Sequence, residues 1–419
     1  MTEEKKKKGL ALHWQILIGI GAGAAFGILL SRIVPFENWS PWIKWAGDIF
    51  LRGLRMIVIP LVFTSIALGV AGMGGTAALG RIAGKTLIYY VVTTLIAATI
   101  GLLVVNLIRP GVGANLNLTQ AVPELNSGKV SFIDQIVSIV PANVFQAMAE
   151  GNLLPIIFFA VIFGFFMNKV EERHANTLKN LFEAIYEVIM KITFFLIHLA
   201  PYGVFAIVAT VVGAQAGNPE ALLSMAGSLG VFVLVIWGGM MIHAFLVLPA
   251  TVRVLGRVNP WRHMAKMSTV LLTAFSTCSS GAALPINIRD SEEKCGISNK
   301  IASFVLPLGC TINMNGTALY ECVTAIFIAQ AYGIDLSLAQ QIMIVFTALL
   351  AAIGSAGIPM AGMVMLTIVL SAVGLPLEGI GLVLAVEQLC DMPRSFVNVY
   401  GDSCGAVIIA RSEGEELTI

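Results

Sequence analysis

Charged residues are scarce in this sequence. They make up 12% of its 419 residues, whereas soluble domains usually carry about 25%. Hydrophobic residues make up 57%, and the mean hydropathy is +0.88. This shortage of charge excludes an ordinary soluble protein and predicts an integral membrane protein.

The sequence also lacks the alternation of apolar and polar residues that is typical of an outer-membrane barrel. Its apolar runs are long enough to cross a bilayer as helices, which takes about 20 residues each. We therefore expect an all-α, multi-spanning membrane protein whose longest runs are tilted, bent or divided. The runs before residue 256 lie near residues 11–34, 44–73, 85–108, 130–168, 178–214 and 224–255.

Basic residues gather at the N-terminus, where Lys5, Lys6, Lys7 and Lys8 precede the first apolar run. By the positive-inside rule this end is expected in the cytoplasm, and the protein in the inner or plasma membrane of the cell. The first run is too long for the apolar part of a signal peptide. We interpret it as a retained first span.

The cysteine and histidine patterns give no sign of a metal or redox centre. All six cysteines lie in the last third without CxxC spacing, and the five histidines are scattered. We interpret the cysteines as small packing residues and the histidines as interfacial or packed side chains. No organic cofactor and no nucleic-acid partner are expected.

After residue 256 the apolar runs are interrupted by small and polar residues. Residues 266–294 contain two apolar arms on either side of SSG, each too short to span, and GSAGIPMAG divides residues 340–374 in the same way. Between them a helix is expected to break at NMNG, residues 313–316. Because lipid does not tolerate exposed backbone, these breaks must face protein or water. The pattern predicts an inverted-repeat transporter core with two re-entrant hairpins.

A polar stripe marks the last apolar segment. At about 100° per residue, its members fall within an arc of about 80° on a helix. They are Glu387, Asp391, Arg394, Asn398 and Asp402. The opposite positions include Leu384, Leu389, Phe396 and Val407. Each central Asp or Arg costs about 2.5–3.5 kcal/mol to insert, so the stripe should face the bundle interior and have a function.

The stripe has the chemistry of a site for an acidic amino acid. Arg394 offers a planar fork suited to a carboxylate, and Asp391, one turn away, suits an ammonium group. Half-helix N-termini near Ser279, Ser280 and Gly357 would add backbone N–H groups for a second carboxylate.

The same region offers ligands for a hard cation. Asp402 and Asn398 supply side-chain oxygens, and unwound backbone around Gly309 and Asn313 supplies carbonyls. Sodium is the expected occupant.

The ordered motifs SSG, NMNGTALY, GSAGIPMAG and DMPRSFVNVYGD, with YYVVTT and PYGVFAIVA upstream, resemble the glutamate transporter family over nearly the whole chain. These are dicarboxylate/amino-acid:cation symporters, and the chain looks like a prokaryotic homologue of the excitatory amino acid transporters. The resemblance implies a homotrimer in the lipid bilayer, with eight transmembrane helices and two re-entrant hairpins per protomer and an elevator-type mechanism.

The resemblance also implies a division of the chain. Scaffold spans would occupy residues 1–75 and 127–214. The transport domain would comprise residues 80–110 and 222–419, with hairpins near residues 260–293 and 338–374.

Family site residues carry over onto matching positions. The implied substrate site comprises Ser280, Thr317, Ile358, Gly362, Asp391, Arg394, Ser395 and Asn398. One implied sodium site comprises Gly309, Asn313, Asn398 and Asp402. A second, under the gating hairpin, comprises Thr311, Met314, Ala352, Ile353 and Ser355. A third comprises Tyr90, Thr93, Thr94 and Asn313, with Asn315 where the family usually has an aspartate.

This chain departs from the family pattern beside that third site. Asn315 removes a formal charge, and Glu387 replaces a more usual aspartate. A buried glutamate is a natural proton carrier, because burial favours its neutral form. Cys278 and Pro393 stand where many relatives carry an extra arginine. Sodium coupling with altered stoichiometry and proton or mixed coupling through Glu387 therefore both stay open, and retention of Asp402 favours sodium.

The expected function is secondary active symport of L-aspartate or L-glutamate into the cell. A C4-dicarboxylate carrier is an alternative that would not need Asp391. An intramembrane aspartyl protease is excluded, because Asp391 and Asp402 lie roughly 16 Å apart along one helix. A pure anion channel would need a continuous polar pore rather than polarity at one depth. No enzyme activity is expected.

Overall fold

The computed structural model describes residues 12–71, 77–113, 137, 140–150, 153–353 and 361–419. Helices account for 85% of the structure and these residues form no strand, which confirms the expected all-α class. The main helices are α1 (Leu12–Ile33), α2 (Phe36–Trp39), α3 (Pro41–Ala71), α4 (Ala77–Ile108), α6 (Val144–Glu150), α7 (Leu153–Met167), α8 (Glu172–Ala214), α9 (Pro219–Ile242), α10 (Leu248–Thr251), α11 (Pro260–Lys266), α12 (Ser268–Thr277), α13 (Ser280–Glu293), α14 (Asn299–Ile312), α15 (Asn315–Ala331), α16 (Leu338–Ile353), α17 (Ala361–Ala372), α18 (Ile380–Leu384) and α19 (Glu387–Ser412).

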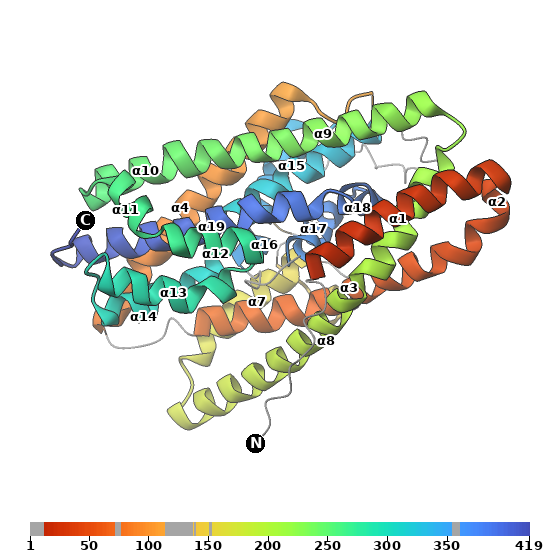
Figure 1. Cartoon of the computed structure of the whole chain (residues 1–419). Coiled ribbons are helices and arrows are strands. Elements are labelled where there is room, and N and C mark those ends of the chain that lie inside the picture. Colours follow the sequence, from red (N-terminus) through yellow and green to blue (C-terminus); the bar gives the residue numbers. More distant parts are fainter. Residues whose placement is uncertain (1–11, 72–76, 114–136, 138–139, 151–152, 354–360) are drawn as a thin grey trace, which may run out of the picture.

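Four N-terminal helices, α1, α3, α7 and α8, form one packed group (Figure 1). α1 approaches α8 closely because glycine recurs along one of its faces. A methyl group added to Gly19 or Gly23 would lie 2.6 Å from the backbone oxygen of Pro201 or Phe205, respectively. Glycine at these positions lets the two backbones touch, as small residues do in membrane helix pairs.

The longest helix, α8, is bent. Its two halves, Glu172–Leu196 and His198–Ala214, differ in direction by 46°. Pro201 lies inside the helix and has no N–H to donate to the carbonyl of residue 197, four positions earlier. The bend therefore falls where the helical hydrogen bond is missing.

A second group of helices surrounds α19, which runs through the middle of the molecule (Figure 1). α19 contacts α4, α9, α12, α13, α14 and α15. As a result, α19 is buried on more than its polar side: Val407 is 0% exposed, whereas Leu389 is 43% exposed. The polar stripe of α19 thus lies inside the second group.

Two helix pairs in this group have polar junctions. α12 and α13 contact each other and join through Cys278, which has a left-handed backbone with φ 52°. Ser279 caps α13, its Oγ accepting a hydrogen bond from the backbone N–H of Ala282 at 3.2 Å. α14 and α15 follow one another with only Asn313 and Met314 between them. Both junctions lie beside α19.

The pair α16 and α17 also packs together. The residues that join them, 354–360, lie outside the described part of the chain. The expected site residues Ser355 and Ile358, and the expected backbone donor Gly357, fall in this segment.

By length and composition, three described helical stretches could cross a membrane. They are Trp14–Ile33, Arg81–Ile108 and Leu222–Gly256, with the bent α8 as a fourth. The third runs from α9 through two π-helical turns, His243–Val247 and Val252–Gly256.

Candidate substrate and cation sites

Arg394 lies at the centre of a buried charge cluster on α19. Its Nη2 is 2.6 Å from Oδ1 of Asp391, and its Nη1 is 2.9 Å from Oε1 of Glu387. Nε donates a further hydrogen bond to Asp391 Oδ1 at 3.0 Å. The guanidinium also lies over the ring of Tyr320, 4.8 Å from its centre. All three charged side chains are at most 2% exposed.

The cluster is unbalanced in charge. One guanidinium faces two carboxylates, so the fully ionised trio of Glu387, Asp391 and Arg394 carries an excess negative charge. Buried ions are stable only when paired. A bound cation, an ammonium group or a proton would therefore be held here more strongly than in water.

Neighbouring polar groups extend this cluster. Asn398 accepts a hydrogen bond from the Gly316 N–H at 2.8 Å and donates one to Thr317 Oγ1 at 3.2 Å. Ser395 Oγ donates to Asp391 Oδ1 at 3.4 Å. These contacts bring the start of α15 against α19.

The absence of a side chain at Gly362 leaves the space that the guanidinium of Arg394 occupies. A methyl group added to Gly362 would collide with Nη1 of Arg394. Ser280, at the start of α13, is 3% exposed. The junction between α12 and α13, at Cys278, contacts α19, since Gln388 Nε2 donates a hydrogen bond to Cys278 Sγ at 3.0 Å. The expected substrate residues therefore gather around one stretch of α19, except Ile358, which is outside the described residues.

Asp402 lies one helical turn beyond Asn398, in a second polar centre. Its Oδ1 accepts a hydrogen bond from Asn313 Nδ2 at 2.8 Å. A methyl group on Gly309 would collide with this carboxylate and would lie 2.6 Å from the Tyr90 hydroxyl. Asn313 Oδ1 is buried without a hydrogen-bond partner in the described structure. A carboxylate and an unpaired amide oxygen are suitable ligands for a hard cation.

The expected third cation site is partly assembled. Thr94 Oγ1 donates a hydrogen bond to Asn315 Oδ1 at 2.6 Å. Tyr90 and Thr93, however, bond to backbone oxygens: the Tyr90 hydroxyl to Val305 at 2.9 Å, and Thr93 Oγ1 to Tyr89 at 2.8 Å.

Asn315 Nδ2 is also buried without a hydrogen-bond partner among the described residues. An amide N–H repels a cation, so Asn315 offers one oxygen ligand where an aspartate would offer two.

The second expected site is less compact. Thr311 is exposed, and its Oγ1 donates to Leu308 O at 3.1 Å within its own helix. Met314 lies deeper, with its Sδ 3.1 Å from Asn398 Nδ2. Ala352 and Ile353 end α16, and Ser355 lies outside the described residues. The described contacts do not bring Thr311, Met314, Ala352 and Ile353 together at one cation-binding position.

Glu321 is a buried carboxyl group that the sequence interpretation missed. It lies on α15, one turn after Thr317, and is 0% exposed. Neither of its carboxyl oxygens has a hydrogen-bond partner in the described structure. An acidic residue within the apolar run of α15 is the signal that could have revealed it, because ionisable groups at membrane depth are functional by default.

Interrupted helices mark the binding site of many membrane transporters, and a buried arginine held between carboxylates beside them is suited to a charged solute. The model of the Sodium:dicarboxylate symporter family matches residues 12–412, and the chain belongs to this family. Its members are membrane symporters and not enzymes.

Several relatives are similar over nearly their whole length. The proton/sodium-glutamate symport protein of Bacillus caldotenax is 36% identical over 98% of this chain and 96% of its own. The proton/glutamate-aspartate symporter of Escherichia coli (strain K12) is 35% identical over 96% and 93%. Excitatory amino acid transporter 3 of Mus musculus is 33% identical over 98% and 88%.

Proposed function

We propose that the protein is a secondary active symporter that moves L-aspartate or L-glutamate into the cell together with sodium. The observation that carries this proposal is the buried pairing of Arg394 with Asp391 on one face of α19. The names of the relatives support an acidic amino acid as the substrate.

The two residues would bind different charged groups of the substrate. Its side-chain carboxylate would bind the guanidinium of Arg394, and its ammonium group would bind Asp391. Thr317, Asn398 and Ser395 would orient the bound molecule, since Ser395 donates to Asp391 and Asn398 donates to Thr317 beside it. A dicarboxylate without an amino group would bring no cationic group to the excess negative charge of Asp391 and Glu387, so amino acids are favoured.

Sodium would bind at the second polar centre. Asp402, Asn313 and the carbonyl of Gly309 would hold the ion, with Asn398 completing the shell. Binding would neutralise Asp402, whose negative charge is otherwise buried at 2% exposure. Asn398 would belong to both the substrate site and the sodium site. Binding at one site would therefore affect binding at the other, which supports coupling of ion and substrate.

Proton coupling is the second candidate, and two buried glutamates favour it. Glu387 pairs with Arg394, so a substrate carboxylate that takes over Nη1 would leave Glu387 without its partner. Glu321 has no hydrogen-bond partner in the described structure. A glutamate in this situation is stable only when it is protonated.

The mechanism proposed for the movement is an elevator. The helices of the first group would form the scaffold, and those around α19 would form the transport domain, in a homotrimer with eight spans and two re-entrant hairpins per protomer. The helices contact one another more within each group than between the groups, and this supports the division. The N-terminus would face the cytoplasm.

Uptake of radiolabelled L-aspartate and L-glutamate into proteoliposomes tests the proposal. Inward sodium and proton gradients are imposed separately, with succinate as the competing dicarboxylate. R394K keeps the charge but loses the planar fork, and is expected to lower uptake at least tenfold. Arg411→Lys, on the exposed end of the same helix, is the matched control and should behave as wild type.

Accumulation driven by sodium alone supports sodium symport. Accumulation under a proton gradient without sodium supports the second candidate and removes sodium from the site at Asp402. Normal uptake by R394K would refute the assigned substrate site.

A further inference from the structure

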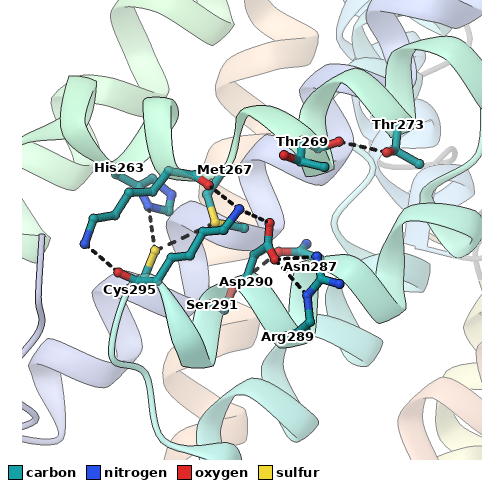
Figure 2. A network of polar contacts seen from close by, with 11 residues as sticks. His263, Met267, Thr269, Thr273, Asn287, Arg289, Asp290, Ser291 and Cys295 are labelled. Atoms are coloured by element: carbon teal, nitrogen blue, oxygen red, sulfur yellow. Dashed lines mark hydrogen bonds and ion pairs between the residues drawn. The ribbon is translucent and has the colours of Figure 1, made fainter.

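Three sulfur and nitrogen donors meet at the base of the α12–α13 hairpin (Figure 2). Cys295 Sγ lies 3.8 Å from His263 Nδ1 and 3.7 Å from Met267 Sδ. All three side chains are 0% exposed. We call His263, Met267 and Cys295 the base cluster.

Local structure brings these residues together from both ends of the hairpin. His263 and Met267 are four residues apart, and the Met267 N–H bonds to the His263 carbonyl at 3.0 Å, so their side chains share one helical face. Cys295 follows α13, in a turn that Gly296 makes possible with φ 76°.

The tautomer of His263 is set by its neighbour on α19. Ser403 Oγ donates its single proton to the Tyr400 carbonyl at 3.0 Å. It must therefore accept from His263 Nε2, which lies 3.1 Å away. Nε2 carries the proton, and Nδ1 turns a lone pair toward Cys295. Ligating histidines are usually oriented by such a bond to the other nitrogen.

From this geometry we propose that the base cluster binds a monovalent soft metal ion, Cu(I). Thiolate, thioether and imidazole are the donors that this ion prefers. Bonds of about 2.0 Å to nitrogen and 2.3 Å to sulfur, at 120° to each other, place the donors about 3.7–4.0 Å apart. The nitrogen–sulfur separation of 3.8 Å lies in this range, and the sulfur–sulfur separation of 3.7 Å lies at its lower end.

The charge balance of the three donors favours a monovalent ion over a divalent one. On binding, the Cys295 thiol releases its proton to water, and the thiolate neutralises Cu(I), so the buried site is uncharged. Zn²⁺ would leave a buried positive charge and lack a fourth ligand. The base cluster has only two ligands of the types that divalent ions prefer, His263 and Cys295. A group of three or more His, Cys, Asp or Glu side chains that could hold a metal does not occur among the described residues.

The carboxylate drawn beside the cluster in Figure 2, that of Asp290, is already engaged. Asp290 is bound by Arg289 at 2.8 Å and by Lys294 at 2.6 Å (Figure 2). The cluster is therefore limited to its three soft donors. Its occupation would tie both ends of the hairpin together.

Metal retention by the purified full-length protein tests this proposal and does not depend on transport. The protein is loaded with Ag(I), a redox-inert probe, or with Cu(I) under argon. It is then passed through a column in the presence of a Cu(I) chelator, and the metal per chain is measured by mass spectrometry. The variants are C295A and the volume-conserving M267L. Their matched controls are C322A, another fully buried thiol, and M264L, on the same helix.

Wild type and both controls are expected to retain one more ion per chain than C295A. M267L is expected to lose the ion at a chelator concentration at least about tenfold lower. Copper-edge absorption should show mixed nitrogen and sulfur ligands, and Ag(I) should raise the unfolding temperature of M264L more than that of M267L. Equal retention by wild type, C295A and M267L would overturn the proposal, as would retention of Zn²⁺ in preference to Ag(I). The cluster would then be only packing, with a Cys295–His263 hydrogen bond.

Discussion

Arg394 and Glu387 form a buried ion pair, with 2.9 Å between Nη1 and Oε1. Glu387 lies two turns before Arg394 on α19, and Asp391 occupies the other side of the guanidinium. The arginine proposed to bind substrate is therefore shared by two carboxylates of its own helix. A substrate carboxylate must compete with one of them.

The first prediction concerns this competition. E387Q removes one competing charge, so we expect L-aspartate to bind about tenfold more tightly, because a charged hydrogen bond contributes about 1.5–3 kcal/mol. The pH dependence of binding should also flatten if Glu387 takes up the proton. Calorimetric titration between pH 5 and 9 measures both quantities. E387D, which keeps the charge, is the control, and weaker binding by E387Q would contradict the prediction.

The second prediction concerns Asn315. N315D replaces the amide N–H, which has no hydrogen-bond partner among the described residues, with a carboxylate oxygen, while Thr94 can still donate its hydrogen bond. We expect the sodium concentration for half-maximal aspartate binding to fall about tenfold, since a charged ligand adds about 1.5 kcal/mol. N106D adds the same charge on the exposed side of α4 and should have little effect. An unchanged sodium dependence in N315D would rule out a cation near residue 315.

The third prediction concerns the proline in α19. Pro393 cannot donate to the Leu389 carbonyl, and Trp237 Nε1 donates to it instead at 3.0 Å. W237F should destabilise the wild-type protein by about 1 kcal/mol, because the carbonyl loses its partner. In a P393A background the helix supplies its own N–H, so W237F should cost less. A double-mutant cycle from unfolding in detergent measures the difference, and additive effects would contradict the prediction.

The fourth prediction concerns the end of the chain. Glu413 joins α4, with 2.5 Å to Arg81 and 2.6 Å to Lys85. The hydrogen bonds from Arg81 and Lys85 lower the pKa of Glu413 from 4.5 to about 2. Its contribution to stability is therefore complete above pH 4.5 and is lost as the pH falls toward 2.

E413Q should accordingly destabilise the protein by about 0.5–1 kcal/mol at pH 7 and by less at pH 3. Thermal unfolding at both pH values measures this difference. E416Q, on an exposed neighbour, should have no effect at either pH. A gap between E413Q and wild type that stays constant down to pH 2.5 would show that charge is not the cause.

The sequence predicted the positions of the helices better than the contacts between side chains of different helices. The apolar runs 11–34 and 44–73 correspond to α1 and α3 within a few residues, because hydrophobicity is a local property. The run 85–108 ends with α4 but starts eight residues after it. The polar face of α19 could also be read from its period. Glu321 directly follows the motif NMNGTALY and belongs to none of the expected sites, although a carboxyl in an apolar helix is itself a signal.

The pairings depended on distances between segments far apart in the chain. Spacing predicted that Arg394 and Asp391 share a face, but not that Glu387 would take the remaining side of the guanidinium. Nor did it indicate that Cys295 would meet His263 and Met267, since their separation in sequence matches no metal motif. Only the packing of the turn after α13 against α11 produced that contact.

The amino-acid sequence by itself thus determined a helical membrane protein with a charged stripe and interrupted helices, because composition and periodicity act over a few turns. The tertiary structure alone decided which carboxylates share Arg394 and which carbonyl Trp237 satisfies. It also decided which buried groups find no hydrogen-bond partner within the described part of the chain. These properties depend on how α4, α9, α13 and α15 pack around α19, and buried polar groups must find partners wherever that packing places them.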